Sequence, residues 1–421
     1  MIRKITLLFI ILLTAHTGFS QKNNTSPYSF FGIGEESADK TVEEMSMGET
    51  GVTYFNPIQL TFSNPASLAA LQLTSYTLGV ENKTLNINDG INKGTAASTS
   101  LSYLAMGIPL GTNGGFSFGL KPNTTVGYSL TEKISETETN YYDGEGGTNK
   151  VFLGFGYKIV KNFNIGLEGS YIFGKVTNSL YNSRDTVLLA TVHKSESRVK
   201  GFALRAGIQY SSKLNDKIRL DLGGLVNLSS ELTNEGNEYL FTNYDNASRA
   251  VNSSYARDTI VNNAFSGKIT KPLKTTLGIG VGQENKWYAT LEYSMQNPIE
   301  FTDGVLDKNT IVSYDKYNKL AFGFLYIPKI NSISSYWQRI HYRAGIKLKQ
   351  TGLVVNDNSI NDFGMSFGVG LPIGKQLSSV NLGFELGKRG KINNGIIKEN
   401  YFNLRLSLTL NDKWFKKTIY N

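Results

Sequence analysis

From residue 73 to the C-terminus, apolar and polar residues alternate with a period of two. Successive side chains of a β-strand point to opposite faces, so this pattern predicts strands that each have one apolar and one polar face. Most segments reach the roughly 9 to 11 tilted residues that cross a bilayer. Clusters of Gly, Asn, Asp or Pro divide the region into fourteen segments: residues 73–86, 97–109, 115–128, 150–160, 163–177, 197–211, 217–229, 271–282, 287–295, 315–327, 339–352, 360–370, 378–387 and 399–410.

The connections between these segments alternate in length. Tight turns follow the second, fourth, sixth, eighth and twelfth segments, and a longer turn, 328–338, follows the tenth. The connections between them are longer, and the largest are 129–149, 178–196, 230–270 and 296–314. Short periplasmic turns and long extracellular loops alternate in this way in outer-membrane barrels. The sequence therefore predicts an all-β fold, a 14-stranded antiparallel transmembrane β-barrel.

The polar faces of these segments carry charges of both signs. In the last segment Phe402 and Leu404 fall on one face, and Asn403 and Arg405 fall on the other. A charge on the lipid face costs about 2–4 kcal/mol at the bilayer midplane, so the polar faces should line the lumen. Opposite charges there can simply pair and brace the wall, but seven of these positions are candidate anchors for a polar ligand: Arg205, Arg219, Glu292, His341, Arg343, Lys347 and Arg405.

Composition agrees with a membrane barrel. The chain has 43 Gly, 23 Tyr and 23 Phe, yet only 40% of its residues are hydrophobic, and its mean hydropathy is −0.22. A lipid-facing barrel needs an apolar residue only at every second position, with aromatic girdles at both interfaces. An exported soluble domain rarely combines so many aromatic residues with so few long apolar runs.

The first twenty residues predict a cleaved signal peptide. Arg3 and Lys4 form a charged start, an apolar run covers 5–13, and Gly18-Phe19-Ser20 resembles a cleavage site before Gln21. A retained membrane helix is the weaker alternative, because polar residues 21–26 follow the run. The predicted address is therefore the cell outer membrane, reached through the periplasm.

Net charge and cysteine content exclude several classes of protein. Cleavage removes Arg3 and Lys4 and lowers the formal charge from +9 to +7, and the remaining charges are scattered. A nucleic-acid binder would cluster Lys and Arg on one face, so no nucleic-acid partner is expected. With no cysteine, the chain has neither a disulfide framework nor a thiol-linked lipid anchor.

The stretch 44–71 does not fit a strand. It contains the pairs Asn56-Pro57 and Asn64-Pro65, and Asn before Pro favours a short helix over 66–71, capped by Asn64. We expect a plug over residues 21–72, a barrel over 73–410 and a periplasmic tail over 411–421. A plain linker is the alternative, but linkers rarely contain this many apolar residues. The candidate plug residues are Met47, Gly48, Gly51, Phe55, Phe62, Asn64, Pro65, Ala66 and Leu68.

Pro122 lies in the middle of the third segment. Proline cannot donate to a β-ladder, so we expect a bulge or break at Lys121, Pro122 and Asn123. The alternative is that the strand ends at Leu120 and Pro122 begins a loop.

Two motifs resemble known barrels. Met47-Gly48-Glu49-Thr50-Gly51 and Asn64-Pro65-Ala66 resemble the hatch of FadL-type outer-membrane transporters of hydrophobic compounds, although Glu49 and Thr50 replace small residues. This resemblance implies a fourteen-stranded barrel, an N-terminal hatch and a third-strand kink that opens a lateral hole. Residues 26–34 near the N-terminus and residues 411–415 near the C-terminus are similar to segments of uncharacterised barrels of Bacteroidetes-type bacteria.

Two functions follow as hypotheses. The first is passive uptake of hydrophobic or amphipathic small molecules through a plugged, porin-like lumen with a lateral opening near strand three. Its partners would be membrane lipids and the ligand. The second is a non-transporting subunit of an outer-membrane secretion or assembly complex. An enzyme is not expected, since His193 falls in a predicted loop and His341 in a strand, and no cofactor or metal site is expected.

Overall fold

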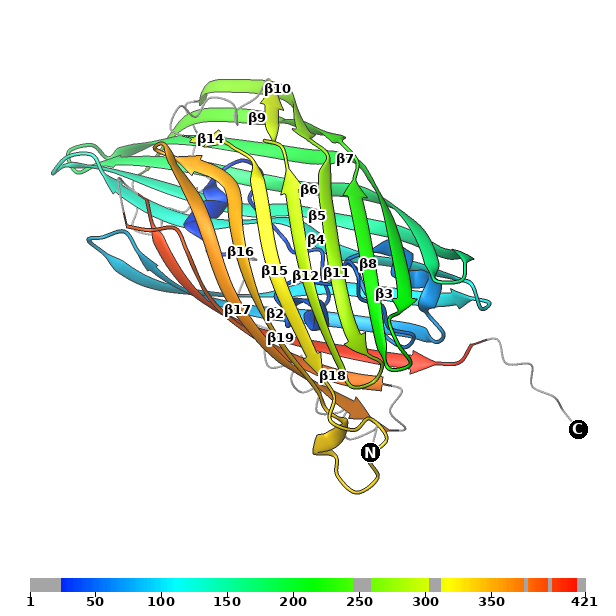
Figure 1. Ribbon diagram of the computed structural model, residues 1–421. Coiled ribbons are helices and arrows are strands. Elements are labelled where there is room, and N and C mark those ends of the chain that lie inside the picture. Colours follow the sequence, from blue (N-terminus) through cyan, green and yellow to red (C-terminus); the bar gives the residue numbers. More distant parts are fainter. Residues whose placement is uncertain (1–23, 245–258, 303–311, 375–377, 393–395, 415–421) are drawn as a thin grey trace, which may run out of the picture.

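Among the described residues of the computed structural model (24–244, 259–302, 312–374, 378–392 and 396–414), fourteen strands close into one antiparallel barrel (Figure 1). The last strand pairs with the first, from Lys398 opposite Asn88 to Asp412 opposite Thr74. The strands of the wall are β2 (Thr74–Asn88), β3 (Lys93–Leu110), β4 (Gly114–Lys133), β5 (Glu138–Val160), β6 (Phe163–Arg184), β7 (Leu189–Lys213), β8 (Ile218–Asn227), β11 (Lys274–Gln283), β12 (Trp287–Gln296), β15 (Tyr317–Tyr326), β16 (His341–Val355), β17 (Asn358–Ile373), β18 (Ser378–Arg389) and β19 (Lys398–Asp412).

Each of the fourteen predicted segments overlaps one of these strands, so the predicted fold class is confirmed. The alternation of faces also holds in β19, where Phe402 and Leu404 are exposed while Asn403 and Arg405 are buried. The membrane's demand for an apolar outer face explains this accuracy, because it repeats the same period-two signal in every strand.

The predicted long loops are wrong in extent, because much of their sequence continues the β-ladders. Residues 230–270, expected as one loop, contain β9 (Ser230–Tyr244) and β10 (Thr259–Lys271), which pair with each other and extend the wall beside β7. Likewise β4 and β5 stay paired out to Lys133 and Thr139. Thr and Tyr in these stretches have high β-propensity and favour pairing beyond the membrane-spanning part as well as within it. Two short strands, β13 (Glu300–Thr302) and β14 (Val312–Tyr314), add to the same end.

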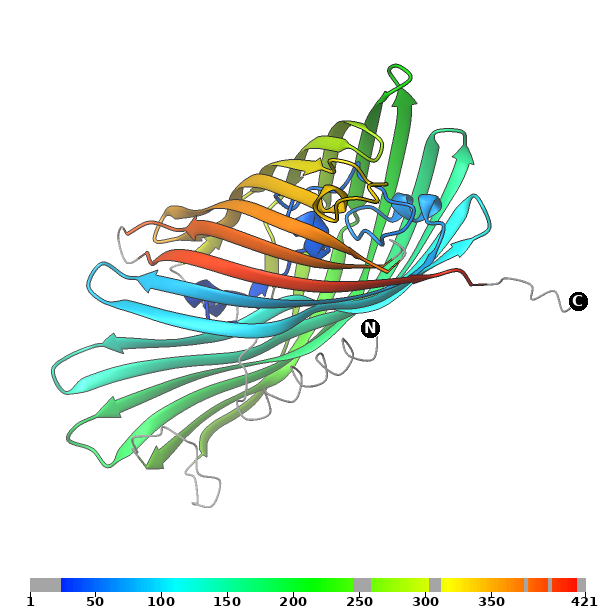
Figure 2. The same cartoon turned by 90° about the horizontal axis from the view of Figure 1, so that it is seen from below.

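The described part of the N-terminal segment, residues 24–73, runs through the barrel lumen (Figure 2). It contains η1 (Pro27–Phe30), the two-residue strand β1 (Glu35–Glu36), α2 (Val42–Met45) and η2 (Pro65–Ala70). Asn64 caps η2 by accepting from the Ala66 amide, with Pro65 as its first residue. The short helix expected here is therefore a 3-10 helix that begins one residue earlier.

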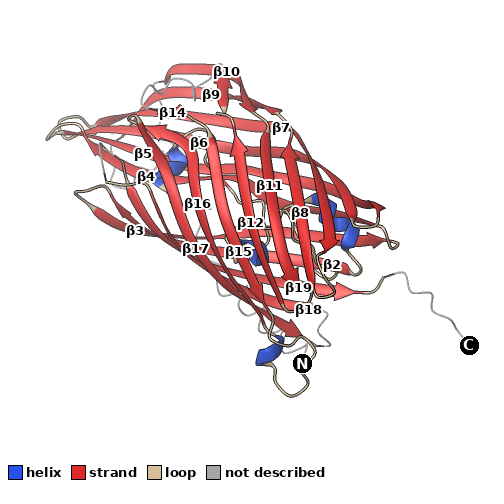
Figure 3. Ribbon diagram, viewed as in Figure 1, coloured by secondary structure: helices blue, strands red, loops and turns tan. Residues whose placement is uncertain are grey.

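One further 3-10 helix, η4 (Trp337–Arg339), lies in the turn before β16 and is seen with the other helices in Figure 3. No helix of the described ranges is long and apolar enough to cross a bilayer. The predicted signal peptide, residues 1–20, lies outside the described residues.

Inward-facing glycines of the wall make room for the N-terminal segment. A Cβ at Gly166 would overlap the backbone of Pro65, and one at Gly345 would overlap that of Gly48. Aromatic rings complete the contact, because Phe62 of the segment packs edge-on against Tyr103 and Phe152 of the wall. The high glycine content is thus partly a packing requirement between wall and segment.

Candidate functional site

The wall is interrupted between β3 and β4. Their ladder runs from Leu110 opposite Gly114 only to Leu104 opposite Leu120. Beyond that point β3 pairs only with β2, and β4 pairs with β5 and with β1. We call the stretch between residues 93–103 of β3 and 121–133 of β4 the seam. The two strands visibly diverge in Figure 2.

The seam begins beside Pro122. β4 does not end at Leu120 but continues through Pro122 to Lys133. Its register with β5 shifts between Pro122 and Thr124, which leaves Asn123 as the extra residue of a bulge. Because a proline has no N–H to donate, the ladder irregularity falls where the sequence removes a donor.

The N-terminal segment covers the β4 side of the seam. Glu35 and Glu36 of β1 pair opposite Thr125 and Thr124, and the Ser37 amide donates to the Asn123 carbonyl at 3.0 Å. Among the described residues, no strand pairs with the facing edge of β3 over 93–103.

Outward side chains place the seam near the upper limit of the apolar band. Leu101 and Leu104 of β3 are exposed and apolar. The next outward residue, Thr99, is polar and bonds to Asn82 of β2 at 2.8 Å. The β3–β4 ladder therefore ends where the outward side chains change from apolar to polar, at the end of the barrel away from the short turns.

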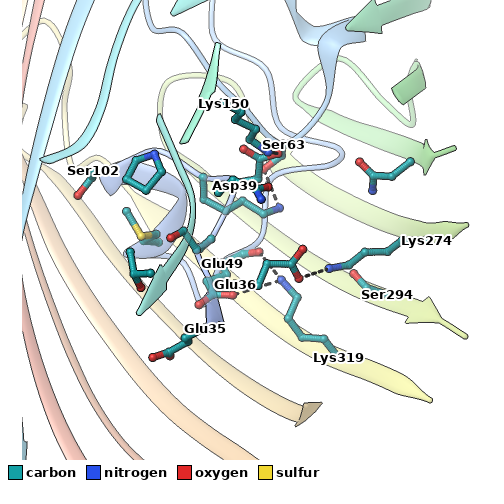
Figure 4. A pocket seen from close by; sticks show the side chains of 18 of the residues that line it. Glu35, Glu36, Asp39, Glu49, Ser63, Ser102, Lys150, Lys274, Ser294 and Lys319 are labelled. Atoms are coloured by element: carbon teal, nitrogen blue, oxygen red, sulfur yellow. Dashed lines mark hydrogen bonds and ion pairs between the residues drawn. The ribbon is translucent and has the colours of Figure 1, made fainter. Parts of the chain in front are cut away.

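A cavity of about 280 Å³ in the lumen is lined by residues of the seam and of the opposite wall. Ser98, Ser102 and Pro122 line it at the seam, and Lys274 and Lys319 line it on the far side. Figure 4 labels Ser102, Lys274 and Lys319 among the lining side chains. Carboxylates and ammonium groups dominate this lining, so the cavity suits a polar or ionised group better than a wholly apolar one.

Two neighbouring acids of β1 reach opposite walls. Glu35 pairs with Arg389 of β18 at 2.6 Å and Lys83 of β2 at 2.9 Å. Glu36 pairs with Lys271 at 2.9 Å and Lys274 at 3.5 Å, on the β10–β11 side. Because adjacent strand residues point in opposite directions, one short strand can span the lumen.

Asp39 contacts a third part of the wall. Its carboxylate lies 2.6 Å from Lys121, 2.7 Å from Lys150 and 3.1 Å from Arg205, on β4, β5 and β7. Arg205 also pairs with Glu168 of β6. We call residues 35–39 the acidic strap, since its three carboxylates bind cations from seven strands around the barrel.

Deeper in the lumen, more ion pairs hold the segment. Glu49 lies 2.5 Å from Lys347 and 3.5 Å from Lys319. Here the wall supplies the acid: Glu292 accepts hydrogen bonds from the backbone amides of Gly51 and Val52 in the segment, at 2.9 and 3.0 Å. Residues 24–72 carry six acids against the single base Lys40. An acidic segment is therefore held in a basic socket.

These pairs keep the segment's carboxylates ionised. Burial alone would raise the pKa of Glu35, but Arg389 and Lys83 outweigh it and hold the pKa well below its usual range. The same balance lowers the pKa of Asp39, through Lys121 and Lys150. At neutral pH the strap therefore carries its full negative charge.

All of the expected plug residues lie in the described N-terminal segment, and all but one of them are buried. Phe55 is half-buried, below the Arg219 guanidinium, whose carbon is 4.4 Å from the ring centroid. The other eight are buried: Met47, Gly48, Gly51, Phe62, Asn64, Pro65, Ala66 and Leu68.

The expected lumen anchors separate into two groups. Arg205, Glu292, Lys347 and Arg405 line the cavity, and all four are in ion pairs. The other three do not line it: Arg219 pairs with Asp221, Arg343 bonds to Asn381 at 3.2 Å, and His341 lies half-buried at the start of β16. Of the kink residues, Pro122 and Asn123 line the cavity, and Lys121 is buried behind them.

The sequence reasoning missed the acidic strap and most of its partners. A usable signal was present, because Glu35, Glu36 and Asp39 stand in a segment with hardly any bases while the polar strand faces are rich in lysine. The partners not singled out were Lys83, Lys121 as an ion-pair partner, Lys150, Lys271, Lys274 and Arg389.

Solved structures share this architecture at low sequence identity. The CymD monoaromatic hydrocarbon channel is 14% identical, with a TM-score of 0.59 over 91% of this chain and 99% of that one. A Pseudomonas aeruginosa FadL homologue is 13% identical, with a TM-score of 0.60 over 89% and 99%. The P. putida toluene transporter TodX is 15% identical, with a TM-score of 0.57 over 91% and 100%. A search of curated proteins found no match.

The closed fourteen-stranded wall and its similarity to these solved structures together define the class, which is an outer-membrane β-barrel with the FadL-type fold. Within that class the chain belongs to the BamG family, whose model matches residues 1–421. At 13–15% identity the solved structures establish the fold of this chain and leave its activity to be argued from its own residues.

Proposed function

We propose that this barrel conducts amphipathic small molecules passively, and that they leave the lumen sideways through the seam. The observation that carries the proposal is that residues from both edges of the seam line the cavity, at the place where the β3–β4 ladder has ended. A polar head would remain in the charged cavity while an apolar tail enters the lipid beside Leu101 and Leu104. Such a solute never has to cross an aqueous pore.

Within this proposal, residues 24–72 act as the plug, and the acidic strap sets which solutes enter. The cationic side chains of the cavity favour an ionised acid as the head group. The solved structures support a solute with an apolar part, because CymD is a monoaromatic hydrocarbon channel and TodX is a toluene transporter. No catalytic step is part of the proposal.

Uptake of labelled oleate and toluene by cells with and without the barrel tests the proposal. Ser100→Trp places a bulky ring at the cavity lining, whereas Thr99→Trp places the same ring on the outer face of the same strand. We expect Ser100→Trp to reduce uptake several-fold and Thr99→Trp to leave it unchanged. Equal uptake by cells with and without the barrel would overturn the proposal.

A second candidate is a non-transporting subunit of an outer-membrane complex. It is favoured by the ion pairs that fix the N-terminal segment to most sides of the barrel wall. The carboxylates in these pairs are Glu35, Glu36, Asp39 and Glu49. A plug held this firmly suits a barrel that serves as a rigid scaffold. A stoichiometric partner in native mass spectrometry after gentle detergent extraction, without any uptake, would favour this candidate.

A further inference from the structure

The turn between β15 and β16, residues 328–340, exposes apolar side chains that the lumen site does not use. We call it the rim loop; in Figure 1 it is the gold segment with a short helix beyond the strand ends. Ile333 is fully exposed and Trp337 is 71% exposed. The root of the loop is anchored, because Ile330 packs against a cluster that contains Tyr54 and Tyr288.

Two hydrogen bonds place the exposed part on the lipid side of the rim. The Tyr342 hydroxyl donates to the Trp337 carbonyl at 3.1 Å. Tyr342 is itself an outward residue of β16, opposite the outward Tyr326 of β15. The Tyr336 hydroxyl donates to the Pro372 carbonyl of the next hairpin at 3.1 Å. Trp337 therefore lies beside an outward aromatic belt and not beneath the lumen.

The charge around this loop is positive. The loop contains Lys329 and Arg339 and no acid. Exposed or half-buried lysines recur at the same end of the barrel and outnumber the acids there, Asp216, Glu284 and Asp412. Cations beside interfacial tryptophan suit a layer of anionic headgroups. The lysines in question are Lys158, Lys161, Lys213, Lys217, Lys286 and Lys413.

We propose that the rim loop binds anionic phospholipid at the leaflet on the short-turn side. Trp337 and Ile333 enter the interface, and Lys329 and Arg339 meet the phosphates. A periplasmic protein is the competing occupant. Lipid is favoured because Trp337 is held at the outward belt formed by Tyr342, where the bilayer surface lies.

Tryptophan fluorescence in nanodiscs tests this proposal with the full barrel. Trp287→Phe and Trp414→Phe leave Trp337 as the only tryptophan. The probes are brominated phosphatidylglycerol and brominated phosphatidylcholine at equal content. We expect quenching by both and about two-fold stronger quenching by phosphatidylglycerol, because anionic lipid gathers near the cations.

Charge removal separates the headgroup contact from simple proximity to lipid. Lys329→Gln with Arg339→Gln should remove the preference for phosphatidylglycerol and leave the quenching by phosphatidylcholine. Lys268→Gln, at the opposite end of the barrel in an exposed pair with Glu231, is the matched control and should change neither. Equal quenching by both lipids, or emission from Trp337 that stays aqueous and unquenched, would overturn the proposal.

Discussion

At the residue scale, Asp39 shows how one carboxylate organises this lumen. It faces Lys121, Lys150 and Arg205, and the Lys121 ammonium also lies 4.6 Å and 4.2 Å from the ring centroids of Phe62 and Phe152. The Lys121 side chain is only 3% exposed. Removing the acid would leave the buried Lys121 ammonium without its carboxylate partner, and such a loss costs more than the pair itself contributes.

Asp39→Asn should therefore destabilise the barrel. Breaking a buried pair costs about 3–5 kcal/mol, and we expect about half of that because the Asp39 side chain is 26% exposed. The temperature at which heated samples change mobility in detergent electrophoresis measures the effect. Glu231→Gln removes one partner of an exposed pair with Lys268 and should cost at most about 1 kcal/mol. Equal shifts for both variants would refute the role given to Asp39.

The wall glycines give a second residue-scale prediction. Gly166→Val should push the N-terminal segment away from β6, because the new side chain overlaps Pro65, and overpacking typically costs about 1–3 kcal/mol. Limited proteolysis should then cut residues 24–72 sooner. Gly169→Val is the control, since it lies on the same strand where a Cβ would meet only Leu204, at 3.5 Å. If both variants are cut at the wild-type rate, the socket does not hold the segment.

At the element scale, the strands were predictable and the lumen contents were only partly so. β12 was placed to within one residue, because its apolar face must meet lipid along its whole length. The acidic strap was not found, since β1 has only two residues and no periodicity. Its position depends on cations that lie far away in the sequence, such as Arg389. A single sequence gives the positions of the charged residues but does not show which of them form ion pairs.

The seam leads to a prediction about backbone protection. Over residues 93–103, β3 pairs with β2 alone, so its seam-side amides lack a strand partner and should open without global unfolding. Hydrogen exchange with mass spectrometry should show faster exchange there than in residues 175–182 of β6, which pair on both sides with β5 and β7. Equal protection of the two stretches would show that the seam is closed in solution.

For the whole molecule, the ion pairs determine how stability depends on pH. The pKa values of Glu35, Asp39 and Glu49 are all lowered in the fold, against burial, by facing cations. A carboxylate whose folded-state pKa is lowered contributes stability above its unfolded pKa of about 4 and loses it as the pH falls through the folded value. Mild acidification should therefore not release the segment.

The unfolding temperature should accordingly stay level between about pH 7 and pH 5 and decline only below about pH 4. In that range the carboxylates of the unfolded chain become protonated, while those of the folded strap, with their lowered pKa, remain ionised. The triple variant Glu35→Gln, Asp39→Asn, Glu49→Gln should have a lower unfolding temperature at neutral pH and a flatter decline in acid. Protease sensitivity of residues 24–72, followed over the same range, separates release of the segment from unfolding of the wall. If the wild-type segment became sensitive already near pH 6, protonation would open the lumen under mild conditions, and the strap would be a pH-controlled gate and not a permanent clamp.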